Sequence, residues 1–173
     1  KMNKPETGNE SEFGVKFTNA TQESGQHHAT FDHSSGDIWT AGNDAQRYEM
    51  WLKRGKVFLD APYKSIGFQM GATYHNTDQY YGKTIYQADQ KTIYGNLLYQ
   101  TIIKDSDHKI VMGTSILVDH VDEKVFGTTY QRREYIPGVF AEMTNRIAEG
   151  FTTIVGLRAD HHNTYGMFFT PRV

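Results

Sequence analysis

Every second residue is apolar in three consecutive runs near the end of the chain, and this pattern constrains the fold more than any other feature. The runs are residues 136–145, 152–160 and 167–173, and two short, unequal connections join them. In the first run the alternation places Val139 and Met143 on the same side. A period of two is typical of β-strands with one apolar and one polar face. Consecutive strands with short connections predict an antiparallel meander.

Five earlier runs show the same alternation, at residues 12–18, 47–58, 65–75, 91–103 and 109–119. The run at 65–75 is the clearest, since every second residue on one side is apolar or aromatic: Ile66, Phe68, Met70, Ala72 and Tyr74. The sequence therefore predicts an all-β chain with about eight antiparallel strands.

The expected connections alternate between long and tight. Long polar loops are expected at 19–43, 76–90 and 120–135, and a moderate one at 161–166, whereas the other connections are tight turns. Short turns at one end and long loops at the other are the layout of an outer-membrane barrel. The strand lengths match tilted transmembrane strands of about nine to eleven residues. The pattern favours a membrane barrel, although an apolar face can also be the core of a soluble sandwich.

Composition narrows the functional classes. The formal net charge of -2 lacks the basic excess of a nucleic-acid-binding protein. The chain has no cysteine, which excludes disulfides and thiolate metal sites. The sequence contains no nucleophile elbow, phosphate-binding glycine loop or Ser-His-Asp spacing. An enzyme is therefore not expected, and no cofactor is expected either.

Histidines gather in the first long loop. His27, His28, Asp32 and His33 lie close together there, and His and Asp are ligands for zinc, copper or nickel. No predicted strand or helix fixes their spacing, however. An ordinary polar loop is the favoured interpretation, and whether a metal binds here is left open.

Sequence motifs in the last forty residues resemble those of a known family. The chain reads PG-x-FAE at 137–142 and GLR-x-DHHN-x-YG-x-F-x-TPR at 156–172. This stretch resembles the barrel of TonB-dependent outer-membrane receptors. The residues that carry the resemblance are Pro137, Gly138, Phe140, Ala141, Glu142, Gly156, Leu157, Arg158, Asp160, His161, His162, Asn163, Tyr165, Gly166, Phe168, Thr170, Pro171 and Arg172.

The resemblance implies a fold, a location and a function. Such receptors import scarce ligands, for example ferric siderophores, cobalamin or other metal chelates, through a plugged barrel of twenty-two strands. Residues 1–173 have room for about eight transmembrane strands, so they are expected to form an internal segment of the barrel without the plug. The implied partners are outer-membrane lipid, the TonB complex through the missing N-terminal part, and a metal chelate or other small ligand; a surface lipoprotein is a further candidate.

The expected site residues fall into two sets. Loop aromatics and histidines at the extracellular end are candidate ligand contacts: His27, His28, His33, Trp39, Tyr80, Tyr81, Tyr86, Tyr130, His161, His162 and Tyr165. Charged residues on the polar faces of the last strands are expected to face the lumen and to pair with one another: Glu142, Arg158, Asp160 and Arg172.

Two other interpretations remain open at this point. A self-contained eight-stranded outer-membrane barrel with a structural or adhesion role requires the first strand to pair with the eighth. A soluble β-sandwich that binds a sugar or a lipid requires the apolar faces to be covered in water.

Overall fold

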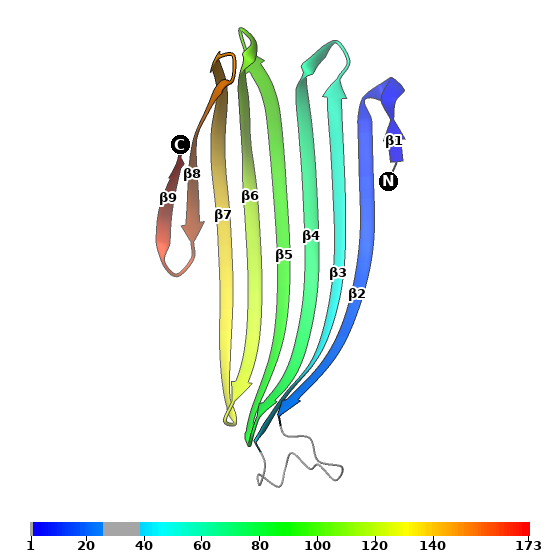
Figure 1. The fold of residues 1–173 in the computed structure, drawn as a ribbon, viewed down its shortest axis with the longest axis vertical. Coiled ribbons are helices and arrows are strands. Elements are labelled where there is room, and N and C mark those ends of the chain that lie inside the picture. The colour runs from blue at the N-terminus through cyan, green and yellow to red at the C-terminus, as the bar shows by residue number, and fades with distance from the viewer. Residues whose placement is uncertain (1, 26–38) are drawn as a thin grey trace.

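The computed structural model describes residues 2–25 and 39–173, which form a single antiparallel sheet (Figure 1). Neighbours in the sheet are neighbours in the sequence throughout. The elements are β1 Met2–Lys4, the 3-10 helix η1 Pro5–Thr7, β2 Asn9–Gly25, β3 Thr40–Phe58, β4 Ala61–Tyr81, β5 Thr84–Ile103, β6 Asp105–Val125, β7 Thr128–Ala148, β8 Phe151–His162 and β9 Gly166–Arg172.

All eight predicted strands are present, as β2 to β9, and the all-β meander is confirmed. The additional strand is β1, whose three residues pair with the start of β2. The sheet is open, because its order runs from β1 to β9 and no pair joins the two outer strands within the described residues. The pairing that a self-contained closed barrel requires is therefore not found among them.

Two of the expected long loops are wrong, because the strands continue through them. Residues 76–90 belong to β4 and β5 apart from a turn at Gly82 and Lys83, and residues 120–135 belong to β6 and β7 apart from Phe126 and Gly127. Phe126 has a φ of 50° and Gly127 a φ of 77°, which is the backbone geometry of a two-residue hairpin turn. Both faces of these segments carry mainly polar residues, so the regular apolar alternation that marks a strand in the sequence is missing.

The strands also extend into the other two expected loops, 19–43 and 161–166. Strand β2 continues to Gly25 and β3 begins at Thr40, while residues 26–38, which include His27, His28 and His33, lie outside the described part. At 161–166 the two histidines belong to β8, and residues 163–165 form the turn.

The two faces of the sheet differ in chemistry. One, here called the apolar face, carries in one cross-strand row Val15, Met50, Ala72, Ile93, Val118 and Tyr135. The other, here called the polar face, carries in the adjoining row Lys16, Glu49, Thr73, Thr92, Asp119 and Glu134.

The polar face is the more crowded one. Apart from Thr40, every buried side chain of the described residues lies on it: Thr77, Ala88, Ser115, Asp119, Val121 and His162. A single-layer sheet buries side chains only against their lateral neighbours, and side chains converge on the concave side of a curved sheet. The burial therefore indicates that the polar face is concave and that the apolar side chains diverge on the convex side.

The apolar residues form a band that slants across the strands. The middle of the band is Val15 on β2 and Val139 on β7. The residue of β7 in the same cross-strand row as Val15 is Tyr135, so the middle of the band has moved by four residues between β2 and β7. On β8 the middle is Leu157, so the band shifts by about one residue per strand. With a rise of about 3.3 Å per residue and a strand spacing of about 4.8 Å, this shift corresponds to strands tilted by about 30 to 35° from the normal to the band. Barrel strands are tilted by a similar angle.

Candidate functional site

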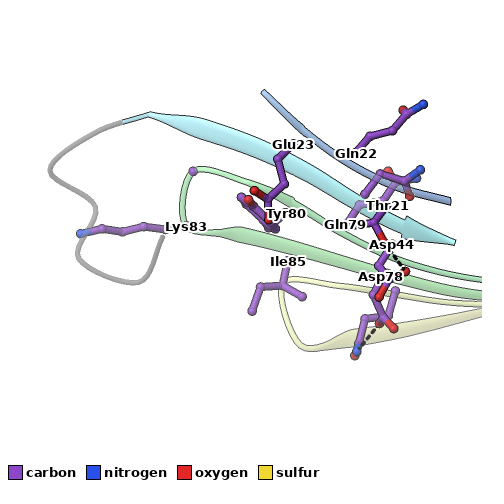
Figure 2. A pocket seen from close by; sticks show the side chains of 12 residues that line it. Thr21, Gln22, Glu23, Asp44, Asp78, Gln79, Tyr80, Lys83 and Ile85 are labelled. Atoms are coloured by element: carbon purple, nitrogen blue, oxygen red, sulfur yellow. Dashed lines mark hydrogen bonds between the residues drawn. The ribbon is translucent and has the colours of Figure 1, made fainter. Parts of the chain in front are cut away.

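A cavity of about 680 Å³ lies at the end of β2, β3, β4 and β5, beyond the apolar band (Figure 2). The alternation of the strands places most of its lining side chains on the apolar-face side of the sheet. These are Thr21 and Glu23 from β2, Asp44 from β3, Asp78 and Tyr80 from β4, and Ile85 and Gln87 from β5.

Hydrogen bonds hold two of the three carboxylates that the described residues contribute to this cavity. Thr21 Oγ1 donates to Asp44 Oδ1 at 3.3 Å, and Gln87 Nε2 donates to Asp78 Oδ1 at 2.7 Å. Lys83, the one cation among the described lining residues, extends away from these carboxylates (Figure 2). The cavity can therefore accept hydrogen bonds from a neutral or positively charged ligand, whereas its charge opposes an anion.

A glycine fixes the ring of Tyr80 in this cavity. Tyr80 is directly opposite Gly42 in the register, and a Cβ atom built on Gly42 would lie 2.2 Å from the ring. The ring therefore covers the glycine, and only a residue without a side chain fits beneath it.

The structure separates the predicted ligand contacts into several groups. Tyr80 lines the cavity, and Trp39 lies at the same end of the sheet, near Gly82. Tyr81, Tyr86 and Tyr130 occupy polar-face positions of their strands. His161, His162 and Tyr165 lie at the β8–β9 hairpin, and the ring centroids of the last two are 4.7 Å apart. The other three, His27, His28 and His33, lie outside the described residues.

Tyr86 is held by a carboxylate on the neighbouring strand. Its hydroxyl donates to Glu123 Oε1 at 2.8 Å. Burial, followed by this hydrogen bond, raises the pKa of Tyr86, so the phenol remains a donor at neutral pH. The Tyr86 hydroxyl proton therefore already has an acceptor on β6.

A polar cluster that the sequence did not predict lies on the concave face around Asp119, which is 7% exposed. Asp119 accepts hydrogen bonds from Gln90 Nε2 at 3.0 and 3.1 Å and from Thr92 Oγ1 at 2.5 Å. Arg132 lies 3.9 Å from Asp119 and 3.6 Å from Glu134. Three strands thus contribute to one network.

The network continues to the β8–β9 hairpin. The Nε2 atom of His162 lies 3.7 Å from Glu134 Oε1. Its Nδ1 accepts a hydrogen bond from the backbone N–H of Thr164 at 3.0 Å, so Nε2 carries the ring proton in the neutral form. Arg132 and Glu134 lie within a predicted loop. Tyr130, Arg132 and Glu134 are spaced two residues apart, and this spacing is the signal in the sequence that could have placed them on one face of a strand.

The four charged residues predicted for the polar face do form pairs. Arg158 binds Asp160 on its own strand at 2.6 Å and Ser115 at 2.7 Å. Arg172 on β9 reaches Glu142 on β7 at 2.7 Å. Gly156 on β8, the strand between them, is paired with Glu142 on one side and with Arg172 on the other. Because Gly156 has no side chain, the two charged side chains can meet across β8.

Asp89, beyond the apolar band on β5, provides a test of the electrostatics. The hydroxyl of Tyr74 donates to Asp89 Oδ1 at 2.6 Å and Asn76 Nδ2 donates at 3.1 Å. These two hydrogen bonds, in that order, lower the pKa of Asp89. Its contribution to stability is therefore complete above the ordinary pKa of an aspartate and is lost as the pH falls through the lowered value.

Tyr74→Phe is expected to raise the pKa of Asp89 toward its ordinary value, because it removes the largest of these effects. The titration of the Asp89 carboxyl carbon by NMR measures the change. Tyr81→Phe is the matched control, since the Tyr81 hydroxyl donates to the neutral amide oxygen of Gln79. An Asp89 titration that is identical in both variants and the parent would contradict the assignment.

Metal ligands are not gathered in the described ranges. No group of three or more His, Asp or Glu residues that could hold a metal ion occurs within 2–25 and 39–173.

Comparisons with known proteins assign no family to the chain. No protein-family model matches it. A search of curated proteins gives no significant match. Within the described residues, no helix has the length and apolar character needed to cross a membrane.

Proposed function

We propose that the chain is a segment of the barrel wall of a TonB-dependent receptor in the bacterial outer membrane. In this role it contributes to the energy-coupled uptake of a scarce ligand such as a ferric siderophore, cobalamin or another metal chelate. The observation that carries the proposal is the inverted distribution of side chains, with the polar groups crowded together and the apolar groups exposed.

The exposed fractions of the apolar side chains support a lipid surround. Phe13 is 64% exposed, Val15 67% and Leu157 55%, and the band that they belong to crosses seven strands, β2 to β8. Soluble proteins rarely expose a continuous apolar patch of more than a few hundred Å². A soluble sandwich would cover this face with a second layer, and the described residues form one sheet.

The height of the band supports the same proposal. On β4 the apolar run extends from Ile66 to Tyr74. The eight steps between these nine residues, at a rise of about 3.3 Å each and a tilt of about 35°, span about 22 Å. Outer-membrane barrels have an apolar band about 25 Å tall, so the run is close to the expected height.

Aromatic and basic residues border one margin of the band. The ring centroids of Phe17 and Tyr48 are 4.8 Å apart, and those of Tyr48 and Tyr74 are 6.2 Å apart. Lys91 follows in the same cross-strand row, with its Nζ atom 5.9 Å from the Tyr74 ring. Aromatic girdles at the boundary between lipid and water have this arrangement.

The polar face is the surface that a transported ligand would meet. In a barrel the concave face lines the lumen, so the polar-face candidates Tyr81, Tyr130 and His162 would face the ligand path. Tyr80 and the cavity around it lie on the opposite side of the wall, facing away from the lumen. This division separates the two groups of aromatic residues by role: the first serves import and the second the outer surface of the receptor.

The direction of the faces can be tested with single cysteines, because the chain has none of its own. Ile116 and Leu117 are adjacent on β6 and occupy the apolar and the polar face respectively. In liposomes, a nitroxide at Ile116→Cys is expected to collide with dissolved oxygen and to be shielded from a water-soluble nickel complex. The label at Leu117→Cys should show the reverse. Equal access of the nickel complex to both would overturn the membrane assignment.

Energy-coupled import needs a separate measurement in cells that carry the whole receptor. Accumulation of radiolabelled ferric siderophore or cobalamin is expected to stop when a protonophore collapses the proton-motive force. Accumulation that continues unchanged would show that uptake does not depend on the proton-motive force. This result would contradict TonB-coupled transport, although not the membrane location.

A further inference from the structure

Two basic residues interrupt the apolar face of β3. Along this face the strand carries Met50 and Leu52, and then Arg54 and Lys56 before its last residue, Phe58. Both basic residues are exposed. Because the apolar band slants across the strands, β3 reaches the margin of the band here, with two cations on the convex side of the sheet.

Apolar side chains of the neighbouring strand lie at the same level. In the register Arg54 is paired with Phe68 and Lys56 with Ile66, both on β4, and both apolar side chains are exposed. The Nζ atom of Lys56 also lies 5.6 Å from the centroid of the Phe58 ring. Cations and exposed hydrocarbon therefore meet at this margin, as they do at the boundary of a lipid bilayer.

The neighbouring positions on this face carry no carboxylate. On β2 the residues paired with Arg54 and Lys56 are Ser11 and Asn9, and the acidic residues of β2 at this level project to the opposite face. Within 2–25 and 39–173, neither basic side chain has an ion pair or a hydrogen bond. Both charges are therefore available to an anion.

The turn that follows β3 leaves the charge of this margin positive. Asp60 lies in the turn, and Lys64 follows on β4, with its Nζ atom 5.7 Å from the centroid of the Tyr63 ring. Residues 54–64 contain three cations and one carboxylate, which gives a net charge of +2. The turn therefore does not neutralise Arg54 and Lys56.

The opposite margin of the band differs in charge. Lys91 and Arg133 lie there in one cross-strand row, and the next row outward contains Asp89 and Asp122. These carboxylates compensate the two cations. An anion is consequently favoured at the β3 margin and opposed at the other one.

We propose that Arg54 and Lys56 bind the phosphate of an anionic phospholipid whose acyl chains lie along Phe68 and Ile66. The Cα atoms of residues two apart on a strand are separated by about 6.6 Å, so both long side chains reach one phosphate. Their hydrocarbon stems cover the apolar face while the charged ends meet the headgroup. The proposal rests on the lipid-facing orientation of the convex face proposed above, and on no assumption about transport.

Native mass spectrometry of the full chain in detergent, with added phospholipid, tests this site. The parent is expected to bind phosphatidylglycerol at least about tenfold more tightly than zwitterionic phosphatidylcholine. The double variant Arg54→Gln/Lys56→Gln should bind phosphatidylglycerol about 25-fold more weakly, since each basic residue near an anionic lipid headgroup contributes about fivefold.

Lys16→Gln/Lys53→Gln is the matched control. It removes the same charge from the polar face, where Lys16 and Lys53 form exposed ion pairs with Glu49 and Glu12, and it should bind phosphatidylglycerol as the parent does. Circular dichroism checks that both double variants retain the β-sheet spectrum of the parent.

Three outcomes would overturn the proposal: equal affinity of the parent for the two lipids, equal loss of affinity in the two double variants, and displacement of the lipid by millimolar inorganic phosphate. The last would assign the two residues to a free anion. The nitroxide at Ile116→Cys separates such a failure from a failure of the membrane assignment. A label that collides with oxygen and is shielded from the nickel complex would show that the convex face contacts lipid and that only the phosphate site is wrong.

Discussion

Gly113→Ala is expected to lower the free energy of unfolding by about 2 to 3 kcal/mol, because the added methyl group overpacks a rigid site. A Cβ atom on Gly113 would lie 2.4 Å from the backbone carbonyl oxygen of Leu97 and 2.7 Å from the ring of Phe140. The carbonyl belongs to the adjacent strand β5, so it can move only if the β5–β6 ladder is distorted. Phe140 is directly opposite Gly113 in the register and covers it.

Gly71→Ala is the matched control for this substitution. Gly71 lies on the same polar face, in β4, and the nearest atom to its added Cβ is the carbonyl oxygen of Met50 at 3.7 Å, an ordinary contact. Denaturant unfolding of both variants in the same detergent measures the difference. Equal loss of stability would show that the general cost of alanine in a strand, rather than the contact with Leu97, determines the effect.

The sequence predicts the strands wherever one face is apolar, and it fails where both faces are polar. The alternation around Met70 and Leu157 fixed the existence and the order of β4 and β8. Beyond Tyr74, β4 continues with asparagine, threonine, aspartate and glutamine on both faces. Without an apolar face, the alternation that identifies a strand in the sequence is absent. Cross-strand hydrogen bonds hold these residues in the sheet, and they depend on a register that the sequence does not contain.

The same limit applies to the candidate sites. Glu142 and Arg172 could be assigned to the polar face from alternation alone, but their pairing across β8 requires the register and the space left by Gly156. The sequence does not predict the Asp119 cluster, because the partners of Asp119 come from β5 and β7 and the segment with Arg132 is predicted as a loop. The predicted loop makes Tyr80 and Tyr81 equivalent, whereas adjacent residues in a strand face opposite sides of the sheet.

Leu97→Arg is expected to lower the free energy of unfolding from a lipid bilayer by about 2 to 4 kcal/mol, the cost of arginine near the middle of a barrel's lipid-facing surface. Leu97 is 44% exposed and lies near the middle of the apolar band on β5. In lipid, its replacement would bring a charge into hydrocarbon, where no water or carboxylate can solvate it. In water the same substitution on an exposed position would be almost neutral.

Leu98→Arg supplies the control, since it changes the same residue type at the next position on the opposite face. Phe140 covers its β6 neighbour Gly113, but Gly67 on β4 and Gly55 opposite it on β3 leave room for the longer side chain. If the polar face lines an aqueous lumen, Leu98→Arg should cost less than about 1 kcal/mol. Denaturant titrations of both variants in liposomes compare the two positions. A larger loss for Leu98→Arg than for Leu97→Arg would mean that the polar face is the one turned toward an apolar environment, which would contradict the barrel arrangement because lipid has to contact the convex side of the wall.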